Sequence, residues 1–393
     1  MRIIFRKRTD KVTARPVPTP VHAPRNTISK TSFLSQQSHH TKRPILNIDV
    51  FATTIALTTF FGISAIMALS LNLQYGLAGI PNFGQAMFVS LGAYTAGWAY
   101  TRLLPLLAGR DFIEPCGAQL GQALQMRSEI LRMLPAIGLT NFVLTLLLAM
   151  LVGGAVGWLA SYPALRLKEE WYLALVLLVG GEIVRIVARG YEPLICAHNG
   201  LSGIGQPFVW LRPGAVAATV FAAFVLLLAG LTYLYCERLV RSPFGRLLKA
   251  LREDDRAALS LGKPVSRVRG QVMFIGSILA ALSGVLFAVN LGFVSANDYG
   301  VALTLDVWVM VVLGGIGNNR GALLGALIVT LLDRVTAVAA IQLNGLGFQW
   351  EFNYVRFILF GLILLFMLRY RPQGLLPESP ATTGAHGVLA QVS

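Results

Sequence analysis

The sequence predicts an all-α, polytopic transmembrane helix bundle with about nine or ten membrane segments, some of them broken or re-entrant. Of its 393 residues, 55% are hydrophobic and only 13% are charged, whereas a soluble domain carries about 25% charged residues. The apolar residues form long uncharged blocks, of which 50–101 is the longest. A bilayer crossing takes roughly 20 apolar residues, and these blocks lack the polar stripe of a soluble amphipathic helix.

The apolar blocks predict nine helices, and the segment after the second differs from them in composition. Residues 104–133 mix charged and apolar side chains, which indicates an external loop with a surface helix. The helices are expected near 50–71, 84–102, 137–160, 171–188, 215–235, 271–291, 303–316, 321–338 and 354–370.

Residues 49–378 form the predicted membrane domain, and the chain ends differ from it. Residues 1–48 are rich in Arg, Ser, Thr and Pro and show no periodicity, which predicts a disordered basic cytoplasmic tail. An Arg- and Ser-rich start is also typical of an organelle transit peptide, but the prolines at 16, 18, 20 and 24 would break its amphipathic helix. Residues 379–393 are expected to be a disordered C-terminal tail.

Basic charge predicts the orientation of the bundle. Of the net charge of +15, residues 1–49 contribute +8 and residues 236–270 contribute +5. Lys and Arg beside membrane spans are typical of cytoplasmic segments, so both segments are expected inside. An even number of crossings must then separate them, and the apolar blocks give five. We therefore expect one more, broken or re-entrant, crossing in 71–83, where two glycines and a proline interrupt the uncharged stretch. Four crossings after residue 270 place the C-terminus inside as well.

The sequence lacks the patterns of several kinds of site. Cys116, Cys196 and Cys236 form no C-x-x-C pair and predict no disulfide framework. Five scattered histidines offer no helical pair for a metal, and no Gly-x-x-x-x-Gly-Lys-Ser/Thr loop is present for ATP. We expect no catalytic site, no metal and no cofactor in this chain. Nucleic acid is disfavoured as a partner because the basic charge lies beside apolar spans and not on a recognition fold.

Two glycine-broken segments lie in the two halves of the chain. The first contains Gly79, Asn82 and Gly84, and the second contains Gly315 and Asn318. Paired interruptions of this kind in a transporter point to the substrate path, and we expect the two segments to face each other there with the asparagines as polar linings. The alternative is close helix packing through small residues, as in Gly-x-x-x-Gly patterns at 153–157 and 321–325.

One ion pair is expected inside a span. Glu182 and Arg185 lie one helical turn apart in an otherwise apolar segment, and charges at such depth face the bundle and pair. A structural pair is the favoured interpretation, and a gate or substrate contact is the alternative.

The basic segment 236–270 is expected to be a loop that contains a short helix. Ser242-Pro243 favours a helix start and Gly262 a stop, and Leu247, Ala250, Leu251 and Ala258 mark an apolar face. Such a helix either lies on the membrane surface or docks into a groove of a soluble partner.

These motifs together resemble one family of membrane proteins, over residues 65–378. Ser-Pro-Phe-Gly-Arg at 242–246, followed by Arg252, Glu253, Asp254, Ala257, Ala258 and Gly262, is similar to the coupling loop of the branched-chain amino acid ABC transporter permeases. Further blocks resemble the same family: Leu71-Asn72-Leu73 with Gly76, Gly92-Ala93-Tyr94, Tyr172-Leu173-Ala174, Glu182-Ile183-Val184-Arg185, 199–204, Gly292-Phe293-Val294-Ser295, 312–317 and 371–377. The chain departs from the family at Pro81-Asn82-Phe83 and at Cys196-Ala197-His198.

The resemblance implies a function and partners. It implies a multi-pass permease in the cell membrane that works with a second permease, ABC ATPase subunits and an extracytoplasmic amino-acid-binding protein, with ATP hydrolysed on the ATPases. The urea-import branch of the superfamily is the alternative for the substrate. An ion-coupled secondary transporter is the alternative for the class, which the sequence disfavours because Glu182 is its lone carboxylate deep within a span. A membrane-embedded enzyme is disfavoured because no catalytic constellation is present.

Overall fold

The computed structural model describes residues 50–166, 170–211, 214–345, 353–371 and 373–378, and these are almost entirely helical. The expected tails, 1–48 and 379–393, lie outside the described residues. The elements in chain order are α1 Val50–Leu71, η1 Asn72–Leu77, α2 Gln85–Trp98, η2 Ala99–Leu103, α3 Leu104–Leu107, α4 Leu120–Met133, α5 Pro135–Arg166, α6 Glu170–Gly190, α7 Glu192–Ile195, η3 Ala197–Asn199, β1 Leu201–Ser202, α8 Gly214–Arg241, α9 Pro243–Glu253, α10 Asp255–Ser260, α11 Val265–Leu291, β2 Phe293–Val294, η4 Ala296–Tyr299, α12 Val301–Gly314, α13 Asn319–Gly345 and α14 Asn353–Tyr370.

Six helices in the described part of the chain are long and apolar enough to cross a membrane. They are Val50–Leu77, Pro135–Tyr162, Trp171–Gly190, Gly214–Arg241, Val265–Leu291 and Asn319–Val338. The expected count of nine or ten is not confirmed: α2 and α12, with 14 residues each, are not among the six. Helical structure extends beyond the uncharged blocks at several ends, so α8 continues to Arg241 and α11 begins at Val265. The segment between α8 and α11 is therefore shorter than the expected loop 236–270, because α8 and α11 each include charged residues that were expected in the loop.

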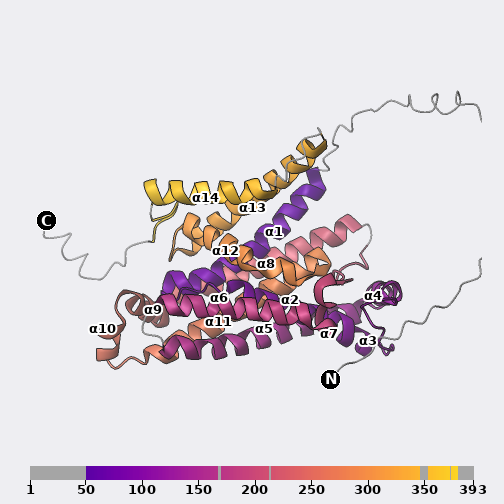
Figure 1. Cartoon of the computed structure of the whole chain (residues 1–393), viewed down its shortest axis with the longest axis horizontal. Coiled ribbons are helices and arrows are strands. Elements are labelled where there is room, and N and C mark those ends of the chain that lie inside the picture. The colour runs from indigo at the N-terminus through magenta and orange to yellow at the C-terminus, as the bar shows by residue number, and fades with distance from the viewer. Residues whose placement is uncertain (1–49, 167–169, 212–213, 346–352, 372, 379–393) are drawn as a thin grey trace, which may run out of the picture. The chain divides into compact units, whose positions relative to one another are not determined.

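The helices run between two ends of the bundle, which we name by what each carries (Figure 1). The loop end carries α9 and α10, and the disulfide end carries α3, α4 and α7. At the disulfide end, β1 and β2 pair antiparallel, with Leu201 opposite Val294 and Ser202 opposite Phe293. This short two-stranded sheet joins the segment after α7 to the segment after α11.

Small residues bring α11 into the centre of the bundle. A side chain at Gly153 would collide with Ala281, and one at Gly157 would collide with Ser277. The backbones of α5 and α11 therefore approach closely, as small residues permit in membrane helices. The predicted packing role of the Gly-x-x-x-Gly pattern at 153–157 is confirmed.

The segment after α1 is broken, but it adds no crossing. Asn72–Leu77 continues α1 as one π-helical stretch, so that 50–77 is a single span. The chain then turns at Gly79, whose φ of 71° is in the left-handed region. The expected extra crossing in 71–83 is wrong, because 78–84 is a short connection between η1 and α2.

The path of α1 also changes the expected topology. Its last turn contacts α9, since Arg252 donates to the carbonyl of Gly76, so α1 begins at the opposite, disulfide end (Figure 1). Between Val50 and the start of α9 the chain then passes along the bundle five times, through α1, α2, α5, α6 and α8. An odd number of passes along the bundle therefore separates Val50 from α9; the expected position of the basic segment 1–49 lies outside the described residues.

Two of the three cysteines are joined, against the expectation of no disulfide. Cys116 and Cys196 form a disulfide across 80 residues of sequence, whereas Cys236 is free and buried. The pairing was not predictable from spacing, because it depends on the α3–α4 connection and the end of α7 meeting at the disulfide end.

The surface helix expected in 104–133 is present as α4, and a buried arginine holds it to β1. Arg127 is 2% exposed, and its guanidinium donates to the carbonyls of Ala123 and Ser202, each at 3.0 Å. Burial lowers the pKa of Arg127 to about 10. The contact with Ser202 and the disulfide fix α4 at two separate points.

Candidate functional site

The short helices α9 and α10 begin with side-chain caps. Ser242 Oγ accepts from the amide of Gly245 at 3.2 Å at the start of α9. Asp254 Oδ1 accepts from the amides of Arg256 and Ala257, at 2.8 and 3.1 Å, at the start of α10. These bonds satisfy amide groups that a helix start leaves unpaired. Asp254 therefore has a structural role in the turn between the two helices.

The two helices bury one face and expose the other. Leu248, Leu251 and Ala258 are buried, whereas Leu261 is 76% and Leu259 57% exposed. Ala250, which was expected on the apolar face, is exposed. Glu253, Ala257 and Gly262 are also exposed, so most of the predicted coupling residues lie on the free surface of the loop end.

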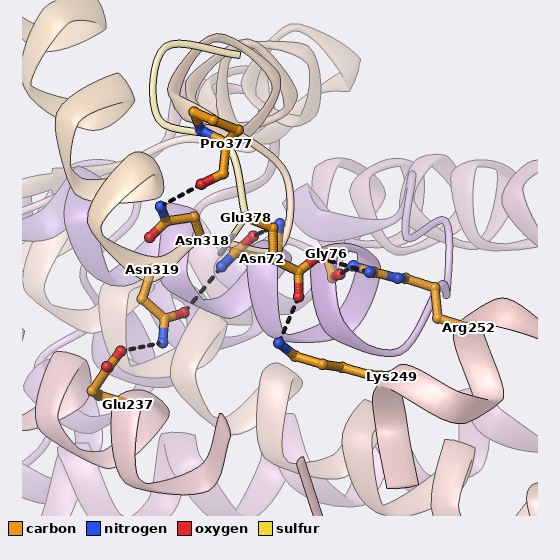
Figure 2. A network of polar contacts seen from close by, with 10 residues as sticks. Asn72, Gly76, Glu237, Lys249, Arg252, Asn318, Asn319, Pro377 and Glu378 are labelled. Carbon is orange, nitrogen blue, oxygen red and sulfur yellow. Dashed lines mark hydrogen bonds and ion pairs between the residues drawn. The ribbon is translucent and has the colours of Figure 1, made fainter. Parts of the chain in front are cut away.

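Arg252 points inward from this surface (Figure 2). Its Nη1 donates to the carbonyl oxygen of Gly76, and its Nη2 donates to Glu378 Oε2 at 2.7 Å. The carbonyls at a helix C-terminus lack intrahelical partners and carry the negative end of the helix dipole. Arg252 therefore caps the end of the span formed by α1 and η1.

Glu378 lies at the centre of this polar network. Its Oε1 pairs with Lys249 Nζ at 2.6 Å while its Oε2 binds Arg252. Desolvation acts to raise the pKa of Glu378, but the hydrogen bonds from Lys249 and Arg252 outweigh it, so that the pKa is lowered. Glu378 is therefore ionised in the folded protein at neutral pH.

Asn72 joins the two broken segments (Figure 2). Its Oδ1 accepts from the amide of Gly317 at 2.9 Å, and its Nδ2 donates to Asn319 Oδ1 at 3.0 Å. Asn319 in turn donates to Glu237 Oε2 at 3.2 Å. Gly76 packs so closely that an added Cβ would lie 2.6 Å from the amide nitrogen of Gly317. The two broken segments thus lie side by side, in tight contact at the loop end.

The predicted pathway residues fall into two groups. Gly79 packs against Arg252, and Gly315 against Leu376, while Asn318 Nδ2 donates to the carbonyls of Leu376 and Pro377. These three lie at the loop end. Gly84 and Glu182 instead line one small pocket together with Met87, Tyr299 and Thr304.

Asn82 is fully buried and hydrogen bonded. Its Nδ2 donates to Gln74 Oε1 at 2.7 Å and to Gln85 Oε1 at 3.1 Å, and its Oδ1 accepts from the amide of Gly84. Trp308 Nε1 donates to its carbonyl. These bonds fix the connection between η1 and α2, so Asn82 shapes the turn beside the Gly84–Glu182 pocket.

The expected ion pair on α6 is confirmed. Arg185 Nη2 lies 2.5 Å from Glu182 Oε2, and both side chains are 29% exposed. Glu182, however, is not the lone carboxylate within a span. Asp333 lies in the middle of α13, which extends to Gly345, and it lines a cavity of about 390 Å³ with Asp298 and Asp306.

Comparison with known proteins identifies the fold family. The family described as "Branched-chain amino acid transport system / permease component" matches residues 53–368. The chain belongs to this family. It is 35% identical, over 82% of its length and 93% of the relative, to the probable branched-chain amino acid transport permease protein LivM of Methanocaldococcus jannaschii. It is 30% identical to the high-affinity branched-chain amino acid transport system permease protein LivM of Escherichia coli, over 82% of this chain and 70% of the relative.

A permease with a different named substrate is also similar to the chain. The autoinducer 2 import system permease protein LsrC of Salmonella typhimurium is 29% identical over 60% of this chain and 73% of the relative. No solved structure is significantly similar to the chain.

Sequence reasoning missed Glu378 and Asn72 as members of the site. Glu378 follows the motif 371–377 directly, and Asn72 lies within a block that resembles the permease family. Both residues lie in or beside motifs that the sequence analysis singled out, but their partners, Arg252 and Gly317, lie 126 and 245 residues away. A contact at such separation follows from the fold and has no local signal.

The lowered pKa of Glu378 predicts a pH dependence. Because its pKa is lower in the folded state than in the unfolded chain, the ionised carboxylate contributes stability above the ordinary Glu pKa, and this is lost as pH falls through the folded value. In thermal unfolding of the detergent-solubilised permease, the Tm difference between wild type and Glu378→Gln should be present at pH 7 and shrink as the pH is lowered toward the acid range. A Tm difference that is equal at all pH values would contradict this role.

Proposed function

We propose that this chain is the membrane-spanning permease subunit of an ABC importer that carries branched-chain amino acids into the cell. The observation that carries the proposal is the pair of capped helices α9 and α10, which present exposed Glu253, Leu259 and Leu261 at one end of the bundle. An exposed apolar pair on a short helix suits docking in a groove of a soluble partner. Relatives named as branched-chain amino acid permeases support the substrate class.

The partners follow from this assignment. ATP is hydrolysed on separate ABC ATPase subunits that dock on α9 and α10. A second permease subunit completes the translocation path within the membrane lipid, and an extracytoplasmic binding protein delivers the amino acid at the disulfide end. Gly84 and Glu182 are the proposed pathway residues, because both line one narrow space of about 10 Å³ between α2, α6 and α12; an amino acid can enter it only when the helices move apart. Gly79, Gly315 and Asn318 are proposed to affect transport indirectly, through their contacts with Arg252, Leu376 and Pro377 at the loop end.

Two observations support a cytoplasmic loop end. The segment 236–270 has an excess of five positive charges, as cytoplasmic segments beside spans do. The disulfide lies at the opposite end, and disulfides persist on the oxidising, external side of a cell membrane. The C-terminal residues 373–378 then face the cytoplasm, and α1 begins on the outer side.

An ion-coupled secondary transporter remains the second class to be tested. The carboxylates of Asp298, Asp306 and Asp333 share one cavity, so the number of acidic residues does not argue against it. Membership of the permease family favours the ABC importer, and the energy source decides between the two classes.

The proposed function predicts ATP-driven uptake that depends on the exposed leucines. Leucine uptake into cells that carry this chain with its ATPase, second permease and binding protein should require ATP and compete with isoleucine and valine. The double change Leu259→Asp and Leu261→Asp should reduce ATPase co-purification about tenfold or more, because buried charge at a docking surface is costly. Arg252 and Asp254 are poor choices for this test, because both have intramolecular partners.

The matched control for added charge is Gln125→Asp, which lies exposed at the disulfide end and should leave ATPase association unchanged. Uptake by the chain without ATPase partners, driven by an ion gradient, would contradict the proposal and favour the secondary transporter. Uptake of autoinducer 2 or urea with no competition by branched-chain amino acids would change the substrate but keep the class.

The orientation predicts which engineered thiols react from outside. In a Cys236→Ser background the native disulfide leaves no free cysteine. Gln125→Cys should then react with a membrane-impermeant maleimide in intact cells, whereas Ser260→Cys should react only after the membrane is permeabilised. Labelling of Ser260→Cys in intact cells would reverse the orientation.

A further inference from the structure

The last described residues of the chain, 373–378, form an irregular segment of turns and bends that we call the C-terminal strap. The strap lies along the break between α12 and α13. The amides of Leu375 and Leu376 donate to the carbonyls of Leu313 and Gly314, at 3.0 and 2.9 Å. Asn318 Nδ2 donates to the carbonyls of Leu376 and Pro377, at 3.2 and 3.1 Å. The strap therefore satisfies two carbonyls at the C-terminus of α12 and the side-chain amide of Asn318, which directly precedes α13.

Glycine permits this close approach. Gly315 has a φ of 126°, which L side chains rarely adopt, and an added Cβ would collide with the carbonyl of Leu376. Gly374 has a φ of 81° and packs directly on the backbone of Gly315. The strap thus packs directly on the backbone of the α12–α13 break, so that a shift of the break displaces the strap.

At its end the strap reaches α9. Glu378 pairs with Lys249 and Arg252 on successive turns of that helix, and the three side chains are between 23% and 27% exposed. Exposed single ion pairs contribute little, but this carboxylate makes two charge-assisted bonds in a partly desolvated site. Arg252 continues the chain of contacts to the carbonyl of Gly76. Three segments distant in sequence, 72–79, 249–252 and 313–318, are thereby connected: Arg252 contacts the first directly, Glu378 contacts the second, and the strap that carries Glu378 contacts the third (Figure 2).

The helix α9 needs such an anchor. It has 11 residues, and isolated helices of this length are marginally stable, so its position depends on tertiary contacts. A partner that pushes on its exposed face can alter the transmembrane helices only through contacts that differ between two states. The bonds of Lys249 and Arg252 connect α9 to the end of α1 and, through Glu378, to the α12–α13 break.

We propose that the C-terminal strap is an internal latch, and that Glu378 is a positioning residue that makes α9 move together with the ends of α1 and α12. This inference rests on the proposed function as an ABC importer permease. Loss of the carboxylate leaves α9 able to bind its ATPase through Leu259 and Leu261, but the movement of α9 is no longer transmitted fully. The phenotype is uncoupling, in which ATP is hydrolysed without a matching import of amino acid.

The test compares Glu378→Gln, Glu378→Asp and Lys249→Gln in the full complex, with Asp111→Asn, an exposed residue at the disulfide end, as control. Glu378→Gln should raise the ATP hydrolysed per amino acid imported about tenfold or more, because both charge-assisted bonds of the carboxylate are weakened, while ATPase co-purification stays normal. Glu378→Asp should restore much of the coupling. Adding Lys249→Gln to Glu378→Gln should cause little further change, because the two residues share one interaction.

A second readout does not depend on the substrate. In a Cys236→Ser background, Leu247→Cys on the half-buried side of α9 should react with a maleimide about tenfold faster when Glu378→Gln is added, because the latch no longer holds the helix. Unchanged thiol reactivity with an unchanged coupling ratio would overturn the latch. Failure of the wild-type complex to import any branched-chain amino acid would overturn the proposed function instead, and the thiol reactivity would still decide the latch.

Discussion

A long membrane helix must satisfy the carbonyl groups at its end, and at the loop end of this protein an arginine meets that need. The span 50–77 ends in a π-helical turn followed by a glycine in the left-handed region, so the carbonyl of Gly76 has no further turn to bond to. Arg252 supplies the donor from a helix 176 residues later in the chain. This requirement fixes α9 against the bundle, and the remaining contacts of the loop end are arranged around it.

The same site explains why two glycine-broken segments occur in the two halves of the chain. They meet at Gly76 and Gly317, where an asparagine bonds to the second backbone in place of a helix turn. The glycines are needed for close contact between backbones, and their role at the loop end is structural. The small pocket lined by Gly84 and Glu182 is formed by other residues than the contact between Gly76 and Gly317.

Hydropathy predicted much of the fold, and local pattern predicted some of the site. Uncharged blocks gave the spans, Ser242-Pro243 gave the start of α9, and the spacing of Glu182 and Arg185 gave their ion pair. The topology failed at 71–83, because a π-helical turn and a short connection can interrupt an apolar stretch without a further crossing. The Cys116–Cys196 disulfide and the bonds of Glu378 join residues 80 and 126 positions apart, and no local pattern carries that information.

The central claim is that α9 and the C-terminal strap form one mechanical unit. Spin labels at Ala250 and Leu376, both exposed, test whether α9 and the strap move together. The distance between the labels is measured by double electron–electron resonance in the assembled complex, with and without trapped ATP. We expect a constant distance between these two labels, while the distance from Ala250 to a label at Gln125 changes with the nucleotide state. A change between Ala250 and Leu376 as large as that between Ala250 and Gln125 would contradict it.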